Sequence, residues 1–361
     1  MQSWPSSRAS SRVRTATGPK SNGVSSINTS PTISTQRIIN LEDGEATPIG
    51  PETHPAVHEG RVALITGAAS GIGFQLCKEL AALGLRIVMA DVNEDDLKAS
   101  AEEIAKIGGQ NNVLVIPTDV SQIDQVERLR DQVYEHYGEV NLLFNNAGVG
   151  LYGGALSGLD NWRKIMDINL FGILNVLQTF TPGMIHQENP SVIVNTGSKQ
   201  GITNPPGNAA YNASKAGVRI LTENLAHELR QSGGNLTAHL FVPGWTYTQM
   251  TGSTSFDGKG EKPTGAWTAE DTVWYMLNKL REGKFYIICP DNETSEDLDR
   301  LRIKWAAGDI VEGRPALSRW HPEWKNTFDE YVSSGLNHFE ERRVQKERRG
   351  TKTPTVQGDN L

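Results

Sequence analysis

The chain has few cysteines and no long hydrophobic run, and these absences exclude several classes of protein. Only Cys77 and Cys289 occur in 361 residues, too few for a disulfide framework, so we expect a reducing compartment. No apolar stretch reaches the roughly 20 residues of a membrane-spanning helix. The formal net charge is −7 and no basic stripe is interleaved with aromatics, so we expect neither a nucleic-acid partner nor a membrane partner.

Acidic residues are absent before Glu42, and this early segment is rich in Ser and Thr. Its basic residues are Arg8, Arg12, Arg14, Lys20 and Arg37. The composition matches transit peptides, but the segment has no amphipathic stripe. We therefore predict a disordered tail over residues 1–58 and a cytoplasmic protein, with the mitochondrial matrix as the alternative.

Short apolar runs alternate with helical patterns between residues 61 and 290. The length suits one domain of about 250–300 residues with tails. This alternation predicts a Rossmann-type doubly wound parallel sheet of about seven strands, with helices on both faces. The expected strands are 61–65, 85–90, 113–116, 142–144, 191–194, 236–242 and 285–288, and the expected helices between them include 93–107, 121–138, 160–185 and 209–231.

A glycine cluster stands between the first expected strand and the first expected helix, at Thr66-Gly-Ala-Ala-Ser-Gly-Ile-Gly73. Glycines let the backbone approach a pyrophosphate, which the helix N-terminus attracts. Asp91 ends the second strand, where its carboxylate would accept hydrogen bonds from a ribose and repel a 2′-phosphate. Ser70 stands where a basic residue would favour that phosphate. These features predict NAD as the cofactor, with NADP less favoured.

Polar residues also end the third and fourth strands. Asp119-Val120 and Asn145-Asn-Ala-Gly148 lie at the carboxyl ends of parallel strands, where open α/β sheets bind ligands. A loop Asx turn explains either segment alone, but their shared edge favours the binding interpretation.

Tyr211 and Lys215 are four residues apart on an expected helix, so their side chains share one face. A tyrosine with the ordinary pKa of about 10 is a poor base at neutral pH, and a nearby cation favours the phenolate. At about 4 Å and an effective dielectric of about 20 the attraction is about 4 kcal/mol, enough to bring that pKa near 7. The pair therefore predicts a general acid/base.

With these residues in place, the chain resembles the short-chain dehydrogenase/reductase superfamily from about Arg61 to Cys289. The motifs arrive in family order: the glycine cluster, Asp119, Asn145 to Gly148, Asn169, Ser198, Tyr211-x-x-x-Lys215, and Pro243-Gly244 with Thr248 behind it. The departures are the long N-terminal tail, Gly197 where a serine is common, and a lengthened C-terminal part.

The resemblance implies a role for each catalytic residue. Tyr211 would be the general acid/base, Lys215 would lower its pKa and hold the nicotinamide ribose, and Ser198 would bond the reacting oxygen. Asn169 would anchor a water that links Lys215 to solvent. The implied cofactor-binding residues are Gly67, Ser70, Ile72, Gly73, Asp91, Asp119, Val120, Asn145, Ala147, Tyr211, Lys215, Pro243, Thr246 and Thr248, and no metal site is expected.

The substrate side is less specific in the sequence. Trp245, Tyr247, Met250 and Trp267 favour an apolar pocket wall in a segment that is a mobile lid in the resembled family, but structural packing explains them equally well. Gly148 to Tyr152 would form the opposite rim. We expect a secondary alcohol or ketone with an apolar or aromatic body as the substrate.

The domain prediction follows from these patterns. It comprises a tail over 1–58, a dinucleotide-binding catalytic domain over 59–292, a C-terminal helical extension over 293–336 and a charged, disordered tail over 337–361. The resemblance implies a homodimer or homotetramer, with Leu170, Phe171, Leu174, Val218 and Leu221 as outward-facing apolar positions. Two rival functions stay open: an isomerase or dehydratase with the same cofactor site, and a non-catalytic NAD-binding regulator.

Overall fold

The computed structural model describes residues 54–258 and 260–350. The predicted transit-peptide or tail segment up to residue 53, and residues 351–361, lie outside the described part of the chain. Residues 54–58 were assigned to that tail, but Ala56 and Val57 are buried. The folded domain therefore begins a few residues before the boundary that the sequence predicted.

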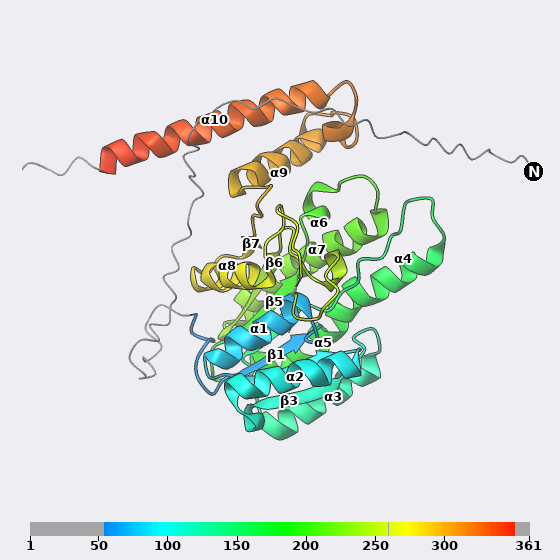
Figure 1. The fold of residues 1–361 in the computed structure, drawn as a ribbon, viewed down its shortest axis with the longest axis vertical. Coiled ribbons are helices and arrows are strands. Elements are labelled where there is room, and N and C mark those ends of the chain that lie inside the picture. The colour runs from blue at the N-terminus through cyan, green and yellow to red at the C-terminus, as the bar shows by residue number, and fades with distance from the viewer. Residues whose placement is uncertain (1–53, 259, 351–361) are drawn as a thin grey trace, which may run out of the picture. The chain divides into compact units, whose positions relative to one another are not determined.

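A seven-stranded, wholly parallel sheet forms the centre of the domain (Figure 1), as the alternating pattern predicted. The strand order is β3-β2-β1-β4-β5-β6-β7. The chain reverses direction across the sheet between β3 and β4, which places a topological switch point at the carboxyl ends of β1 and β4. The strands are β1 (Val62–Thr66), β2 (Arg86–Asp91), β3 (Val113–Pro117), β4 (Leu142–Asn145), β5 (Ser191–Thr196), β6 (Leu236–Val242) and β7 (Tyr286–Ile288).

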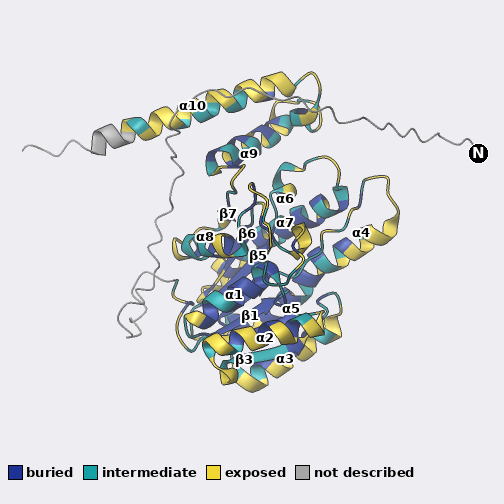
Figure 2. Ribbon diagram, in the orientation of Figure 1, coloured by how far each residue is buried: buried dark blue, intermediate teal, exposed yellow. Residues whose placement is uncertain are grey.

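Helices cover both faces of the sheet, because the central strands are apolar on both sides. One face packs against α1 (Gly71–Ala82), α2 (Glu94–Gly108) and α8 (Ala269–Arg281). The other packs against α3 (Ile123–Tyr137), α5 (Ile173–Ile185) and α7 (Ala209–Ser232). Figure 2 shows the strands as the most deeply buried part of the fold.

Local signals explain several helix ends. The side chain of Asn93 caps α2 by accepting from the Asp96 N–H, and Gly138 ends α3 in the left-handed conformation, both as predicted. Helix α8 was not predicted, although Thr268 and Asp271 form a capping box at its start. Four short helical turns were also missed: η1 (Gln110–Asn112), α6 (Gln200–Thr203), η3 (Gln249–Thr251) and η4 (Ser318–Trp320).

The helix expected over 160–185 is interrupted by a π-helical turn. It consists of α4 (Leu159–Met166), the π-turn η2 (Asp167–Gly172) and α5. Within the described residues, Leu159–Ile185 is long and apolar enough to span a membrane by composition, with a mean hydropathy of 1.2, contrary to our expectation. Val176 and Phe180 are fully buried against the sheet, so core packing accounts for its apolar residues.

The C-terminal extension contains α9 (Glu296–Val311) and α10 (Lys325–Gly350). Figure 1 shows α10 running alongside α9 and α9 lying next to α6. The prediction that residues 337–350 are disordered was wrong, because α10 continues through them. Trp305 of α9 packs against Phe328 and Tyr331 of α10, with ring centroids 5.3 and 5.1 Å apart, which anchors the first half of α10.

Candidate functional site

The predicted motifs meet at the carboxyl ends of β1, β4, β5 and β6. The glycine loop leaves β1, Asn145 to Gly148 leave β4, Ser198 follows β5, and Pro243 follows β6. Parallel pairing places Thr66 beside Asn145, and Asn145 beside Asn195. The sheet therefore gathers residues more than 170 positions apart at one edge.

The loop between β1 and α1 fits a dinucleotide pyrophosphate. Gly67 has a φ of +66°, and a side chain on Gly73 would collide with the Gly67 carbonyl oxygen. The first turn of α1 contains no acidic residue, and the side chain of its N-cap, Ser70, makes no capping hydrogen bond. No side chain therefore neutralises the positive end of this helix, which suits an external anion.

Two residues that the sequence analysis did not single out hold this loop in shape. Thr66 accepts the backbone N–H groups of Asn146 and Ala147 at 3.1 and 3.2 Å. The Asn146 amide donates to the carbonyls of Thr66 and Gly67 at 3.3 and 3.2 Å. The loops after β1 and β4 are therefore one hydrogen-bonded unit.

Asp91 lies at the end of β2, where the sequence placed it. One carboxylate oxygen accepts from the Ala69 N–H of the glycine loop, and the other accepts from the Asn93 N–H, both at 3.0 Å. Asp91 thus fixes the loop in addition to presenting a negative charge near the expected ribose position.

The other strand-end residues divide into two groups. The Asp119 carboxylate accepts from the Ser121 backbone and hydroxyl at 2.9 and 2.7 Å, and Val120 packs against Gly172 of η2. The buried side chain of Asn145 donates to Asn195, which donates to Thr222. The Asn145 side chain therefore belongs to a polar chain inside the sheet, and only its backbone borders the site.

The three residues expected at the reacting centre are brought together. Tyr211 and Lys215 share one face of α7, and the Lys215 Nζ lies 5.9 Å from the centre of the Tyr211 ring. The Tyr211 phenol is hydrogen-bonded with the Ser198 side chain. Ser198 Oγ in turn accepts from the Gln200 N–H at 3.2 Å, so the start of α6 orients the serine.

The electrostatics of this pair differ from the sequence prediction. Burial raises the pKa of Tyr211, and the hydrogen bond with Ser198 only partly opposes that effect. Burial also lowers the pKa of Lys215 to about 8, and its ammonium group donates to the Thr196 carbonyl at 2.9 Å. Desolvation disfavours both the phenolate of Tyr211 and the ammonium of Lys215. Without a bound cofactor, Lys215 therefore does not bring the pKa of Tyr211 below 10.

Asn169 lies in the π-turn and is fully buried. Its amide group is bonded to the Val149 backbone in both directions, at 2.8 and 3.0 Å. A Cβ on Gly148 would lie 3.2 Å from Asn169 Oδ1 and 3.7 Å from Lys215 Nζ. Glycine at this position leaves space between the asparagine and the lysine, and π-turns inside α-helices occur frequently at functional sites.

The lid segment, residues 244–268 apart from 259, follows β6. Pro243 immediately precedes it. Thr246 is buried, and its hydroxyl shares a hydrogen bond with Thr272 of α8. The methyl group of Thr248 approaches Gly71 at the start of α1.

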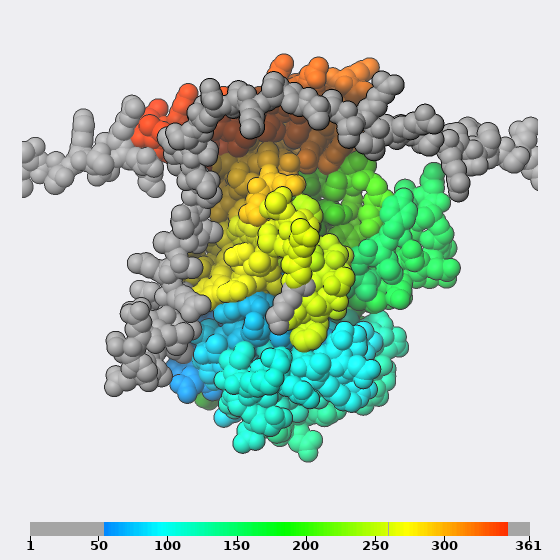
Figure 3. All heavy atoms as spheres, viewed as in Figure 1, coloured from blue at the N-terminus to red at the C-terminus, as the bar shows by residue number. Residues whose placement is uncertain are grey.

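The lid segment lies over the start of α1 (Figure 3). The Phe256 carbonyl accepts the Gly71 N–H at 3.0 Å, and the rings of Phe256 and Phe74 contact edge to face at 5.3 Å. The lid segment is therefore attached to the same helix end that would hold the pyrophosphate.

The aromatic residues near the expected substrate side have different roles. Tyr247 is buried, and Trp267 packs against Tyr275 at 5.8 Å, so these two serve structural packing. Trp245, Met250 and Tyr152 are exposed and are the residues available to line a substrate site. Met250 also contacts Gly150 of the opposite rim.

Asn208, which the sequence analysis also missed, attaches this rim to the catalytic helix. As the N-cap of α7 its side-chain oxygen accepts from the Tyr211 N–H, and it also accepts from the Gly153 N–H at 3.0 Å. Its amide donates to the Leu151 carbonyl at 2.9 Å. An asparagine three residues before Tyr211 was the available signal, because it is a preferred N-cap residue.

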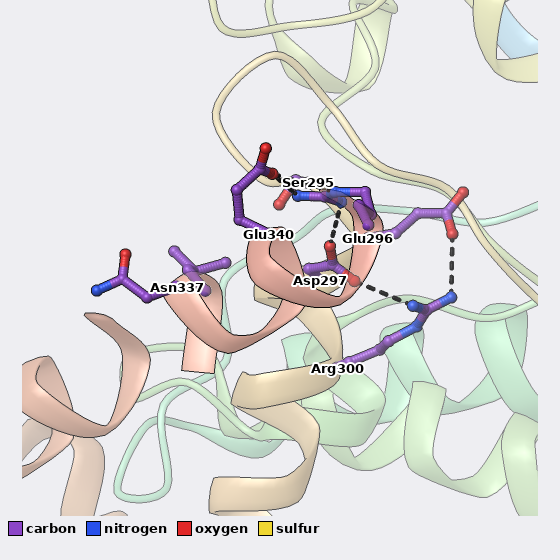
Figure 4. A pocket seen from close by; sticks show the side chains of 8 residues that line it. Ser295, Glu296, Asp297, Arg300, Asn337 and Glu340 are labelled. Atoms are coloured by element: carbon purple, nitrogen blue, oxygen red, sulfur yellow. Dashed lines mark hydrogen bonds and ion pairs between the residues drawn. The ribbon is translucent and has the colours of Figure 1, made fainter. Parts of the chain in front are cut away.

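A hollow of about 540 Å³ lies between the start of α9 and the middle of α10 (Figure 4). Its arginines are paired with neighbouring acids: Arg300 with Glu296 and Asp297, and Arg343 with Asp297 and Glu340. It contains none of the predicted site residues, so we place the chemistry at the sheet edge.

Comparisons with known proteins agree with this placement. Residues 61–258 match the short chain dehydrogenase family. A 1-deoxy-11-beta-hydroxypentalenate dehydrogenase of Streptomyces exfoliatus is 30% identical over 264 residues, which cover 72% of this chain and 94% of that protein. The chain belongs to the short-chain dehydrogenase family, as its motifs indicated.

Solved structures extend the likeness to the whole catalytic domain. A short-chain dehydrogenase/reductase from Burkholderia phymatum, in complex with NAD, is 31% identical with a TM-score of 0.63, covering 71% of this chain and 96% of that one. A metagenomic short-chain oxidoreductase in complex with NADP is 29% identical with a TM-score of 0.51, covering 62% and 91%. The protein is an NAD(P)-dependent oxidoreductase acting on alcohol or ketone groups of a small molecule.

Proposed function

We propose that this protein interconverts a secondary alcohol and a ketone with NAD, using Tyr211 as the general acid/base. The observation that carries the proposal is the shared position of Tyr211, Ser198 and Lys215 beside the nucleotide loop. A retired site in a regulator would be free to lose these side chains. The described part of the chain also holds no larger substrate domain of the kind found in the isomerase and dehydratase branch.

The residues would divide the reaction as follows. Bound NAD supplies the hydride acceptor or donor. Tyr211 takes the hydroxyl proton during oxidation and returns it during reduction. Ser198 would donate a hydrogen bond to the reacting oxygen, and Lys215 would hold the ribose of the bound cofactor. Gly148 leaves room for a water between Asn169 and Lys215, which would carry protons towards solvent.

The preference for NAD over NADP rests on the acid at the end of β2. The carboxylate of Asp91 is held in place by two backbone N–H groups, so it cannot swing away from an incoming 2′-phosphate. Ser70 adds no positive charge to compensate. A phosphate oxygen near this carboxylate would meet like-charge repulsion.

The exposed Trp245, Met250 and Tyr152 support a substrate with an apolar or aromatic body. They stand on the lid segment and on the opposite rim, where they would surround the part of the molecule beyond the reacting carbon. The name of the Streptomyces relative, a dehydrogenase of hydroxypentalenate, is consistent with an apolar secondary alcohol. A panel of such alcohols with NAD and NADP side by side would identify the substrate class.

Replacing Tyr211 with phenylalanine tests the mechanism. We expect turnover to fall by about a thousandfold, within the range that general acid–base catalysis contributes, while NAD binding measured by fluorescence titration is retained. The change in absorbance of the cofactor over the alcohol panel gives the rate. Equal turnover by Tyr211→Phe and the unaltered protein would refute the proposed role.

We further propose a homodimer or homotetramer in the cytoplasm, with the mitochondrial matrix as the alternative location. The oligomer is supported by the apolar side chains exposed on η2 and α7. The location is tested by fusing residues 1–58 to a fluorescent reporter, where a purely cytosolic signal removes the matrix alternative.

A further inference from the structure

Lys199, the residue directly after Ser198, lies between two acidic residues. Its ammonium group is 3.2 Å from Asp291 and 2.7 Å from Asp299. The side chains of Asp291 and Asp299 are 6% and 8% exposed, and that of Lys199 is 20% exposed. These groups are largely desolvated, so their attraction is screened much less than that of a surface pair.

Asp291 connects this lysine to both ends of the lid segment. The carboxylate oxygen that faces Lys199 also accepts the Trp245 N–H at 3.0 Å. The next residue, Asn292, donates to the Thr264 carbonyl and accepts from the Trp267 indole. The short stretch after β7 therefore holds residues near both ends of the lid segment.

Asp299 connects the same lysine to the C-terminal extension. It belongs to α9, which packs against α6 directly after Lys199. Burial raises the pKa of Asp299, and Lys199 opposes that effect. Burial would also raise the pKa of Asp291, but the Trp245 N–H and Lys199 outweigh it and hold the pKa low. Lys199 is thus the cation that contacts both carboxylates, while Arg302 also favours the charged form of Asp299.

We propose that Lys199 is a positioning residue for the reaction. Its ammonium group fixes the Ser198 segment against the start of the lid segment and attaches both to α9. The inference rests on the proposed function, because it gives Lys199 its role through Ser198 and Trp245. It also makes the C-terminal extension part of the catalytic unit, because Asp299 belongs to α9.

The geometry explains why the effect would reach the chemistry. Lys199 is the N-cap of α6, and the next residue, Gln200, donates the hydrogen bond that orients Ser198 Oγ. A shift of this turn moves the serine relative to Tyr211. Misplacement of a catalytic group by about 1 Å can cost about a hundredfold in rate.

The test compares Lys199→Met with Lys98→Met in the full chain. Lys98 forms an ion pair with Glu94 on the exposed surface of α2, so its replacement removes one cation away from the site. We expect Lys199→Met to lower kcat by about tenfold to a hundredfold, with the Kd for NAD within about threefold of the unaltered value. Lys98→Met should leave both quantities unchanged.

Two further variants separate positioning from simple destabilisation. Lys199→Arg keeps the charge and should recover most of the kcat. Asp299→Asn should lower kcat in the same direction, and the double variant with Lys199→Met should lose less than the product of the two single losses, because the pair acts as a unit. Independent, fully multiplicative losses would overturn the inference.

Hydrogen exchange provides a measurement that needs no substrate. Lys199→Met and Asp299→Asn should both increase deuterium uptake at 198–204 and at 244–248, whereas Lys98→Met should not.

If the unaltered protein oxidises no alcohol, the proposed function fails while this measurement still decides the inference. If Lys199→Met does not fold, Asp299→Asn carries the same test. Unaltered uptake together with unaltered kcat in the folded variants would exclude the positioning role.

Discussion

Tyr211 is surrounded by groups that act in opposite directions on its pKa. Burial raises the pKa, and the Ser198 hydroxyl lowers it by bonding the phenolate. Lys215, whose pKa burial lowers to about 8, stands 5.9 Å from the ring centre. The balance depends on single contacts, so individual substitutions should move the pH dependence as well as the rate.

Replacing Ser198 with alanine should shift the pH profile of alcohol oxidation. Oxidation needs the phenolate of Tyr211, so kcat/KM should rise with pH in the unaltered protein. Removing the hydrogen bond that lowers the pKa of Tyr211 should move this rise to higher pH, in addition to reducing the rate. Profiles from pH 6 to 10 measure the shift, and a profile of unchanged position would contradict the assigned contact.

Replacing Asp91 with asparagine should change the choice of cofactor. The neutral side chain removes the repulsion of a 2′-phosphate, which is worth about 1 kcal/mol or more, so the ratio of kcat/KM with NADP to that with NAD should rise about tenfold. One of the two bonds to Ala69 and Asn93 is lost, at a cost of about 1 kcal/mol in stability.

The exposed Asp95 on α2 provides a matched control for this charge change. Asp95→Asn removes the same charge four residues away, without a bond to the glycine loop. Its cofactor ratio should equal that of the unaltered protein. If both variants changed the ratio equally, net charge rather than the position of Asp91 would determine the preference.

Among the elements, the strands and most helices were predicted from local sequence patterns, whereas the π-turn and α8 were not. The π-turn η2 contains Asn169, which is bonded to Val149 on another segment, and no periodicity in the sequence reveals such a contact. The start of α8 carries a recognisable capping box at Thr268 and Asp271. Its buried Val273, Met276 and Leu280 also recur at helical spacing, so the sequence held a signal for α8 that was not used.

The segment before β1 is joined to β6 by two histidines. The rings of His54 and His239 lie 6.1 Å apart. Burial and the neighbouring His239 lower the pKa of His54 from 6.5 to about 4, and burial lowers the pKa of His239. Both are therefore held neutral in the folded state, where protonation is disfavoured relative to the unfolded chain.

This contact should make stability depend on pH between about 6.5 and 4. Because the folded-state pKa of His54 is lowered, its stabilising contribution is complete above pH 6.5 and is lost as the pH falls towards 4. Between pH 7 and pH 5, the melting temperature of the His54→Asn variant should therefore fall by less than that of the unaltered protein. Replacement of the exposed His58 is the control, and equal losses in all three proteins would refute the contact.

For the whole molecule, the outward-facing positions differ in part from the prediction. Val218 is fully buried, so its assignment to an outer surface was wrong, because the inner face of α7 packs on the sheet. Phe171 is 47% exposed, and Ile220, which was not singled out, is 52% exposed. They lie on η2 and α7, which contact each other, and they form the core of the proposed subunit interface.

A combined Phe171→Glu and Ile220→Glu variant should reduce the mass of the particle in solution. Burying two carboxylates in an apolar interface is unfavourable, so size-exclusion chromatography with light scattering should show a smaller assembly. Ile310→Glu, at an 86% exposed position on α9, should not change the mass. An unaltered protein that elutes as a monomer would contradict the predicted oligomer.

The sequence by itself determined the class of fold, the glycine loop, Asp91, and the Tyr211–Lys215 pair. Each depends on local spacing: alternating apolar runs, glycines at a strand end, and two residues four apart on a helix. The tertiary structure alone decided that Asn145 faces the sheet interior, that α10 continues to Gly350, and that Lys199 joins α9 to Ser198. These outcomes depend on contacts between residues far apart in the chain, and on the desolvation that such contacts produce.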